Sequence, residues 1–440
     1  MRVLIWATHL QTDILALAAH LDRVPGVAML IVVPGADRFR RTALARARPF
    51  QAPVIDRADP RLSAWLAAFG ADVVVADNHI PPPGSAPRLL YMWHGLGWKA
   101  RSQLDLRVFC LQVKRLTGID PRTPNSRFRA QCYGPTDRAW RIEKWGLPPS
   151  ACVTTGMAFA DLIDDAPLKR TELAKHYRID VMNRHTVLLS VTWHYGGIFA
   201  QRPGTGRTLA SLFGRGASSP RDLEFVRGLI DKVREHGANL LICLHDRHRY
   251  DPDFIAELEA IEADEPLVEM RFKDEHPDNM SDLLVADVML SNLSSFISYF
   301  YLLGRPAIHI LPGDPSGVIE RTTMLLSRIR LRRRVSADRA WMIDPHDTGG
   351  VLIMNTDDAK KELDAALRNP DLHTRAAADW LDRHLPIRDG RACERLTTEL
   401  ERLCLASLPT RKSVSPGSTD IRFVERYRRS GSSAEGQLRS

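Results

Sequence analysis

The heptapeptide V-A-M-L-I-V-V at residues 27–33 is an unbroken apolar run between Pro25-Gly26 and Pro34-Gly35. A strand that is buried on both faces, as in a parallel sheet, has a continuous apolar sequence, whereas a half-buried strand alternates. Similar apolar runs lie at residues 3–7, 73–76 and 89–93, and helical patterns lie between them at 13–21 and 60–69. This alternation predicts an α/β domain built on an open parallel sheet.

A second series of the same kind begins near residue 185. Its apolar runs lie at 187–191, 239–244, 288–291 and 306–310, and its helical patterns at 221–236, 254–263 and 295–303. The chain has 440 residues, which is too long for one ordinary hydrophobic core. We therefore predict an α/β fold with two Rossmann-like domains facing a cleft, at residues 1–165 and 166–405. The second includes three C-terminal helices, at 357–368, 371–384 and 391–405.

Two segments outside these patterns are rich in polar residues. Residues 196–220 are rich in Gly, Ser and Arg and are expected to form a mobile loop. Residues 406–440 are expected to be a disordered basic tail. Seven basic and three acidic residues lie between 410 and 440, and this surplus of four is half of the net charge of +8. Because the excess charge outside the tail is small, the composition does not indicate a protein that binds nucleic acid.

The cysteines and the lengths of the apolar runs bear on the cellular compartment. Six scattered cysteines without a C-x-x-C pair predict neither a disulfide framework nor a structural zinc site, and they favour a cytoplasmic protein. No apolar run approaches the roughly 18 residues that a membrane-spanning helix needs, so contact with the inner face of the membrane would be peripheral. The basic stretch at 328–334 could touch anionic lipid head groups or form a solvated face, and the sequence leaves both open.

Candidate site residues follow the predicted strands directly. In open parallel sheets, ligands bind beyond the carboxyl ends of the strands. At those positions the sequence places polar or glycine residues, namely His94, Gly95, Gly97, Lys99, Thr192, His245, Arg247, Asn292, Ser294 and Ser295. The two histidines fall in different domains, so facing sheets would point both into one cleft. That arrangement predicts group transfer, with the acceptor on the first domain and the donor on the second.

Each of these residue types has a chemical use and an ordinary alternative. Histidine accepts protons near neutral pH, and glycine lets a backbone approach a ligand closely. Lys99 could neutralise phosphate charge, and Ser294 and Ser295 at a helix N-terminus could hold a phosphate. Alternatively, His94 could be a loop residue, the serines an ordinary helix cap, and residues 245–249 a solvated basic turn. A metal site at 245–248 lacks further ligands, so we predict none.

Absent motifs exclude several enzyme classes. The first apolar run is followed by Thr8-His9-Leu10, not by G-x-G-x-x-G, which argues against a dinucleotide cofactor. The sequence has no P-loop and no H-E-x-x-H motif, and Gly313–Gly317 does not match the hydrolase G-x-S-x-G. We therefore predict an enzyme without a cofactor.

Several segments between residues 90 and 310 resemble the CDP-glycerol glycerophosphotransferase family of teichoic-acid and capsule-type polymerases. The most specific is D-L-L-V-A-D-V-M-L-S-N-L-S-S at 282–295, followed by L-G-R-P at 303–306. It is similar to the family's D-L-L-x-x-S-D-V-L-I-T-D-Y-S-S and L-x-G-R-P. The others are W-H-G-L-G-W-K at 93–99, the stretch from 133–134 through 145–146 to 155–161, and the segments 189–193 and 244–245.

The resemblance implies a GT-B-like fold and transfer of glycerol phosphate from CDP-glycerol to a hydroxyl of a polymer or lipid-linked acceptor. It implies catalytic roles for His94 and His245 and contacts from Ser294 and Ser295 to the donor phosphate. The sequence departs from the family at several positions. Leu96-Gly97 replaces Thr-Pro, Ala158-Phe159 replaces Pro-Arg, Asn292 replaces an Asp, and the family's acidic residue near Tyr299 is missing.

Two alternatives remain open at this point. The chain could be a GT-B glycosyltransferase or a sugar-nucleotide epimerase that uses a UDP-sugar, because one scaffold hosts many reactions. It could also be a degenerate, non-catalytic transferase fold that binds nucleotide or a membrane. For the transferase, the sequence suggests direct displacement, with His94 as general base and His245, Lys99 and the Ser294–Ser295 helix terminus stabilising phosphate charge.

Overall fold

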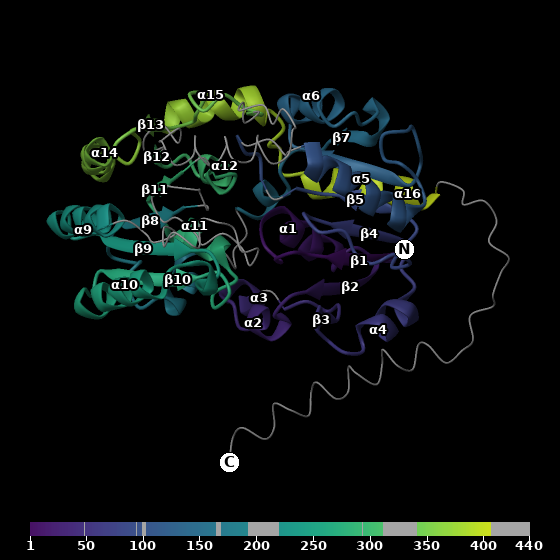
Figure 1. Ribbon diagram of the computed structural model, residues 1–440, viewed down its shortest axis with the longest axis horizontal. Helices are drawn as coiled ribbons and strands as arrows, with labels where there is room; N and C mark the ends of the chain where they lie inside the picture. The colour runs from purple at the N-terminus through teal and green to yellow at the C-terminus, as the bar shows by residue number, and fades with distance from the viewer. Residues whose placement is uncertain are drawn as a thin grey trace, which may run out of the picture.

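Two parallel β-sheets stand side by side, each flanked by helices (Figure 1). A computed structural model describes residues 1–47, 49–93, 95–98, 103–163, 169–191, 220–292, 294–310 and 341–405. The predicted fold of two Rossmann-like domains is confirmed. The predicted loop at 196–220, apart from Pro220, lies outside the described residues, as do the basic stretch at 328–334 and the tail at 406–440.

The first sheet has seven strands in the order β3-β2-β1-β4-β5-β6-β7, and every pairing in it is parallel. Its strands are β1 (Arg2–Trp6), β2 (Ala28–Val33), β3 (Val54–Asp56), β4 (Val73–Ala76), β5 (Leu89–Tyr91), β6 (Phe128–Cys132) and β7 (Cys152–Thr154). The helices between them are α1 (Thr12–Leu21), α2 (Ala36–Arg40), α3 (Ala43–Ala47), α4 (Leu62–Phe69), α5 (Gln103–Thr117) and α6 (Pro135–Glu143). The strand order reverses between β1 and β4, which is where ligands bind in such sheets.

The second sheet repeats the pattern in the order β10-β9-β8-β11-β12-β13, again with parallel pairs. Its strands are β8 (Thr186–Ser190), β9 (Asn239–Leu244), β10 (Val268–Phe272), β11 (Val288–Ser291), β12 (Ala307–Ile310) and β13 (Val351–Ile353). Its helices are α9 (Pro220–Glu235), α10 (Pro252–Asp264), α11 (Asn279–Val285), α12 (Phe296–Tyr301) and α14 (Thr356–Arg368). The order reverses between β8 and β11.

The polar segment 161–183, whose sequence pattern is helical and which we expect to link the domains, is mostly irregular in its described residues. It includes the end of the 3-10 turn η2 (Ala158–Leu162), the 3-10 turn η4 (Ala174–His176) and the short helix α7 (Arg170–Leu173). Arg170 pairs with Asp287 through two bonds of 2.7 and 2.8 Å. This ion pair fastens the link to the start of β11.

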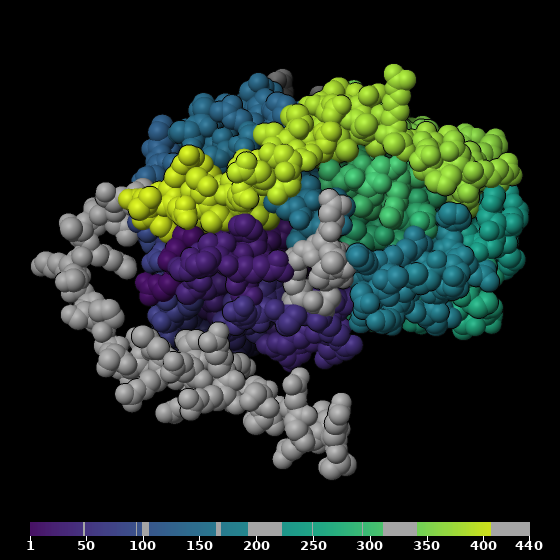
Figure 2. All heavy atoms as spheres, turned by 180° about the vertical axis from the view of Figure 1, so that it is seen from behind, coloured from purple at the N-terminus to yellow at the C-terminus, as the bar shows by residue number. Residues whose placement is uncertain are grey.

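The last two helices return toward the first domain. Figure 2 shows the C-terminal segment, green to yellow, crossing the back of the molecule from one half to the other. Helix α15 (Thr374–His384) contacts α6 and α12, and α16 (Ala392–Leu405) packs on α1, η2 and strands β4 to β6. The predicted domain boundaries placed α16 with the second domain, whereas its apolar face packs against the first sheet.

The edge strand β10 lacks the apolar run that identified other strands, because its sequence is V-E-M-R-F. Glu269 and Arg271 are nevertheless buried, and their side chains approach to 3.4 Å. Arg271 also lies 3.1 Å from the buried carboxylate of Asp282. Charge pairing therefore permits burial of a strand whose sequence reads as polar.

Candidate active site

The two domains meet where a loop of the first sheet contacts the first turn of helix α12. We call residues 95–98, which follow β5, the glycine loop. An added Cβ at Gly95 would lie 2.7 Å from Cε2 of Tyr299 and 2.8 Å from the backbone oxygen of Ser295. One at Gly97 would lie 3.1 Å from Cβ of Ser295. Gly95 also has a φ of 103°, which side-chain-bearing residues rarely adopt. The close contact between the domains therefore requires a glycine at position 95 and favours one at position 97.

Trp98 fixes the far end of the glycine loop. Its ring is fully buried and stacks on Trp380 of α15, with ring centroids 5.5 Å apart. Its Nε1–H donates to the backbone oxygen of Asp347 at 2.9 Å, and its own carbonyl accepts from Met342 at 2.8 Å. The loop is thus held between the two domains at both ends.

The segment after β11 also lies at this contact. Asn292 and Ser294 are buried at the switch point of the second sheet. The hydroxyl oxygen of Ser294 accepts a hydrogen bond from the Phe296 N–H at 3.3 Å, and the Ser294 N–H donates to the Asn292 carbonyl. Ser294 therefore accepts one backbone N–H at the start of α12, whereas the N-cap residue Ser295 makes no capping hydrogen bond with its side chain. Contact of this segment with a donor phosphate stays a prediction.

His245 follows β9, two strand spacings from β11, which corresponds to about 10 Å. Its Nδ1 lies 3.0 Å from the backbone nitrogen of Asp246 and 3.3 Å from Oδ2 of the Asp246 carboxylate. A neutral ring that accepts the Asp246 N–H carries its proton on Nε2. The backbone N–H of His245 donates to the hydroxyl of Tyr250 at 2.9 Å. These bonds fix the backbone of His245 and the orientation of its ring.

The side chain of Arg247, one of the predicted site residues, lies in a cluster of ion pairs. Its guanidinium donates to Glu275 at 2.7 Å and to Glu259, and it lies 4.0 Å above the ring of Phe272. The structure therefore places it among carboxylates of its own domain, and substrate binding by Arg247 stays a prediction. The remaining predicted residues, His94, Lys99 and Thr192, lie outside the described residues.

Asp13 lies at the centre of the domain contact, and the strand-end rule did not select it. Its side chain is fully buried in the first turn of α1. Its Oδ1 accepts the Phe159 N–H at 2.8 Å, while its Oδ2 accepts the hydroxyl of Tyr133 at 3.0 Å and that of Tyr299. Burial raises the pKa of Asp13 to about 6, although these hydrogen bonds oppose the shift. The sequence showed only an acidic residue near a helix start, which is an ordinary feature.

A conformational outlier precedes Asp13. Thr12 has a φ of 52°, the one positive φ outside glycine among the described residues. A β-branched residue in this region carries a cost of about 1–3 kcal/mol, and such outliers cluster at functional sites. The strain therefore coincides with the domain contact.

Asp77 is a second buried carboxyl that the sequence analysis did not select. It follows β4, at the switch point of the first sheet. Its Oδ1 accepts the Thr8 N–H at 2.6 Å, and the Thr8 hydroxyl lies 2.8 Å from Nδ1 of His79. Burial raises the pKa of Asp77 to about 6, against these bonds from Thr8 and the nearby Arg57. The strand-end rule finds both Asp77 and His79 once it is applied to the run at 73–76.

Two acidic residues of the family-like segments hold the fold together. Asp161 accepts the N–H groups of Ala392 and Cys393, at 3.2 and 2.7 Å, and so caps α16. Asp282 accepts the hydroxyl of Tyr177 at 2.8 Å and lies beside Arg271. The family-like pattern thus includes structural anchors as well as candidate site residues.

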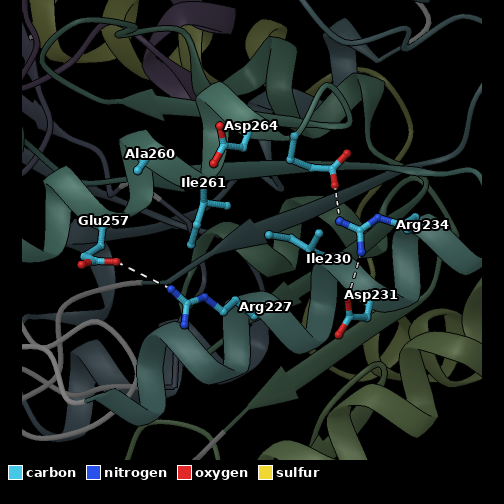
Figure 3. Close-up of a pocket in the computed structure, with 9 residues that line it drawn as sticks. Arg227, Ile230, Asp231, Arg234, Glu257, Ala260, Ile261 and Asp264 are labelled. Carbon is cyan, nitrogen blue, oxygen red and sulfur yellow. Dashed lines mark hydrogen bonds and ion pairs between the residues drawn. The ribbon is translucent and has the colours of Figure 1, made fainter.

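Within the described ranges, no cluster of three His, Cys, Asp or Glu side chains is arranged to hold a metal ion. No helix in the described part of the chain is long and apolar enough to cross a membrane. Figure 3 shows a groove between α9 and α10 of the second domain, in which Arg227 faces Glu257 at 3.6 Å and Arg234 faces Asp231 at 3.1 Å. The first pair links α9 to α10 and the second lies within α9, so we interpret the groove as a feature of helix packing.

Comparison with known proteins bears on the fold. No protein-family model and no curated protein sequence match this chain. The wall teichoic acid polymerase TagF matches with a TM-score of 0.61 and 11% identity, over 91% of this chain and 88% of that chain. A TagF variant soaked with CDPG matches with a TM-score of 0.59 and 11% identity over 91% of this chain and 89% of that chain. UDP-GlcNAc 2-epimerase from Neisseria meningitidis, bound to UDP-GlcNAc, matches with a TM-score of 0.52 and 11% identity, over 91% and 100%. At such identities the likeness concerns the fold alone, and this chain has a GT-B-like fold of two Rossmann-like domains.

Proposed function

We propose that this chain is a transferase that uses a nucleotide-activated donor, with glycerol phosphate from CDP-glycerol as the preferred group. The acceptor is a hydroxyl of a polymer or a lipid-linked molecule. The observation that carries the proposal is the contact between the glycine loop and the Ser294–Ser295 turn. Two segments that resemble one transferase family, 200 residues apart in sequence, pack against each other across the domain interface.

The proposed reaction is a direct displacement at the phosphorus that bears the glycerol. The acceptor oxygen forms the new P–O bond, the bond to the bridging oxygen of the diphosphate breaks, and CMP departs with the electron pair. His94 takes the proton of the acceptor hydroxyl. The contact of Gly95, the next residue in the sequence, with Ser295 supports the choice of His94 as the base.

Residues of the second domain would bind the donor. His245, with Nδ1 engaged by Asp246, can present an Nε2 proton to the phosphate oxygens. His245 lies about 10 Å from the β11 end. That spacing suits a nucleoside diphosphate that spans both strand ends.

A specific observation supports a second candidate, a reaction of a UDP-sugar. The structure of an epimerase bound to UDP-GlcNAc shares the fold over the full length of that chain. In addition, Asn292 replaces the acidic residue of the family pattern at the donor turn. A buried amide in place of a carboxylate changes the hydrogen bonds and the charge offered to a donor.

Calorimetric titration distinguishes the candidates. The purified chain is titrated with CDP-glycerol, CMP, UDP and UDP-sugars, and the titration is repeated on His245→Ala. The exposed His248 of the same turn provides the matched control, His248→Ala. Cytidine-selective binding that weakens in His245→Ala alone supports the glycerophosphotransferase. Uridine-selective binding supports the UDP-sugar reaction, and the absence of any binding contradicts both.

Turnover tests the role of the base. His94→Ala is expected to lower kcat by about 10²- to 10⁴-fold, the usual contribution of a general base, without unfolding the chain. An unchanged kcat would exclude His94 as the base. For a UDP-sugar, product formation without an added acceptor would identify an epimerase rather than a glycosyltransferase.

A further inference from the structure

Asp13 joins four segments of the chain at the domain contact. Its own helix α1 and the Phe159 N–H belong to the first domain, as does Tyr133 at the end of β6. Tyr299 belongs to α12 of the second domain. The side chains of Asp13, Tyr133 and Tyr299 are completely buried. One carboxylate therefore receives hydrogen bonds from both domains.

The same carboxylate reaches the glycine loop through one intermediate. The N–H of Gly95 donates to the hydroxyl oxygen of Tyr133 at 2.8 Å, and that hydroxyl donates its proton to Asp13 at 3.0 Å. A phenol that donates to a carboxylate becomes a better acceptor at its oxygen, because hydrogen bonds in a chain polarise one another. Burial also raises the pKa of Tyr133 and Tyr299 well above the usual value, so both remain donors at neutral pH.

Packing makes the arrangement specific. The ring of Tyr299 lies directly against Gly95, where it leaves no room for a Cβ. The hydroxyls of Tyr299 and Tyr133 therefore meet at the same oxygen of Asp13 from opposite domains. Loss of the Tyr133 hydroxyl would leave the Gly95 N–H without this acceptor, which is costly in a dry interior.

We propose that Asp13 is a positioning residue, which couples contact between the two domains to the conformation of the glycine loop. The catalytic part of this proposal rests on the function proposed above. The structural part, that Asp13 holds the loop, stands on the hydrogen bonds and the packing alone.

The structural part is tested by hydrogen exchange of a peptide that spans residues 90–98, in the full-length chain. Asp13→Asn and Tyr133→Phe are each expected to speed exchange of the Gly95 amide by about 2- to 10-fold, the usual effect of weakening or losing a hydrogen bond to a neutral acceptor such as the Tyr133 hydroxyl. The double variant is expected to be no worse than either single variant, because both changes break one chain of hydrogen bonds. Unchanged exchange in Asp13→Asn overturns the proposal.

Asp22→Asn is the matched control. Asp22 caps the other end of α1, where it accepts the N–H groups of Gln51 and Ala52 at 2.7 and 3.0 Å. The same chemical change there is expected to leave exchange of the 90–98 peptide unchanged. Equal acceleration by Asp22→Asn would mean that the effect is general loosening of α1, and it would overturn the proposal.

Tyr299→Phe tests the coupling between the domains with the smallest change, since it keeps the ring against Gly95. It is expected to speed exchange of the same peptide and to lower kcat by about tenfold, with KM for the donor changed much less. A rise in KM alone, or a fall in activity that only follows the fraction of unfolded protein, overturns the catalytic part. If the unaltered chain turns over no nucleotide donor, the proposed function fails, whereas the exchange experiment still decides the role of Asp13.

Discussion

Gly95→Ala probes the domain contact most directly. The substitution places a methyl group 2.7 Å from Cε2 of Tyr299 and 2.8 Å from the carbonyl oxygen of Ser295. Ordinary contacts between such atoms are about 3.5–4.0 Å, so roughly 1 Å must be gained by movement. The Ser295 oxygen cannot swing aside, because it accepts the N–H of Ser298 at 3.2 Å and its hydroxyl at 2.6 Å.

The magnitude follows from two parts. The φ of 103° at Gly95 costs an alanine about 1–2 kcal/mol. The steric overlap costs a further 1–3 kcal/mol or so, as overpacking of a filled interior does. We therefore expect Gly95→Ala to lower the free energy of unfolding by about 2–5 kcal/mol.

Two other glycines separate these parts. Gly84 has a φ of 87° and no atom within 4 Å of an added Cβ, so Gly84→Ala measures the backbone cost alone. Gly97 lacks a positive φ, and its added Cβ would lie 3.1 Å from that of Ser295, so Gly97→Ala measures a mild contact of about 1 kcal/mol. The expected order of destabilisation places Gly95→Ala above both controls.

The assay is urea unfolding at neutral pH, followed by circular dichroism and by tryptophan fluorescence. Coincident transitions with the two probes establish that a single free energy describes the change. A cost for Gly95→Ala no larger than that for Gly84→Ala would refute the close contact between the glycine loop and α12, and with it the basis of the proposed function.

Two more predictions concern buried charges. Burial raises the pKa of Asp13 and Asp77 from 3.8 to about 6. Between these values the folded chain still binds protons that the unfolded chain has released. The free energy of unfolding therefore falls as the pH rises from about 4 to about 6, by roughly 3 kcal/mol for each group. Urea unfolding across this pH range should show that the free energy of unfolding of the unaltered chain falls relative to that of Asp13→Asn. A difference between the two that does not depend on pH would contradict the raised pKa. Arg141→Met removes the ion-pair partner of Asp137, 2.8 Å away in a pair whose side chains are at most 5% exposed, and should cost about 3–5 kcal/mol because a buried carboxylate loses its counter-charge. Asp137 also accepts the Tyr133 N–H at 3.1 Å, so the second change that tests this reason is Asp137→Asn, which removes the charge and keeps an acceptor. Restoration by Asp137→Asn would support the reason, and a loss under about 1 kcal/mol in Arg141→Met would contradict it.

The sequence alone determined the class of fold. Unbroken apolar runs such as 27–33 and 239–244 alternate with helical patterns, and this combination is typical of strands in a parallel sheet that helices cover on both faces. Strands such as β6 and β10 escaped this rule because polar residues interrupt them. Arg271 of β10 is tolerated in the interior because Glu269 and Asp282 lie beside it.

The strand ends likewise indicated the region of the site but not its composition. The rule selected Gly95, Gly97 and Ser295, and these residues do meet at the domain contact. It did not select Asp13 or Tyr133. Their relation depends on a hydrogen bond between residues 120 positions apart, and no local pattern encodes such a distance.

Only the tertiary structure decided how polar residues divide between structural and candidate catalytic roles. Arg247, Asp161 and Asp282 have the residue types and positions of ligand-binding groups, yet their charges are engaged by Glu275, by the α16 N-terminus and by Arg271. Sequence specifies which side chains carry charge, because that is a property of each residue. It does not specify which opposite charge each one meets, because partners are brought together only when the two domains and their helices pack.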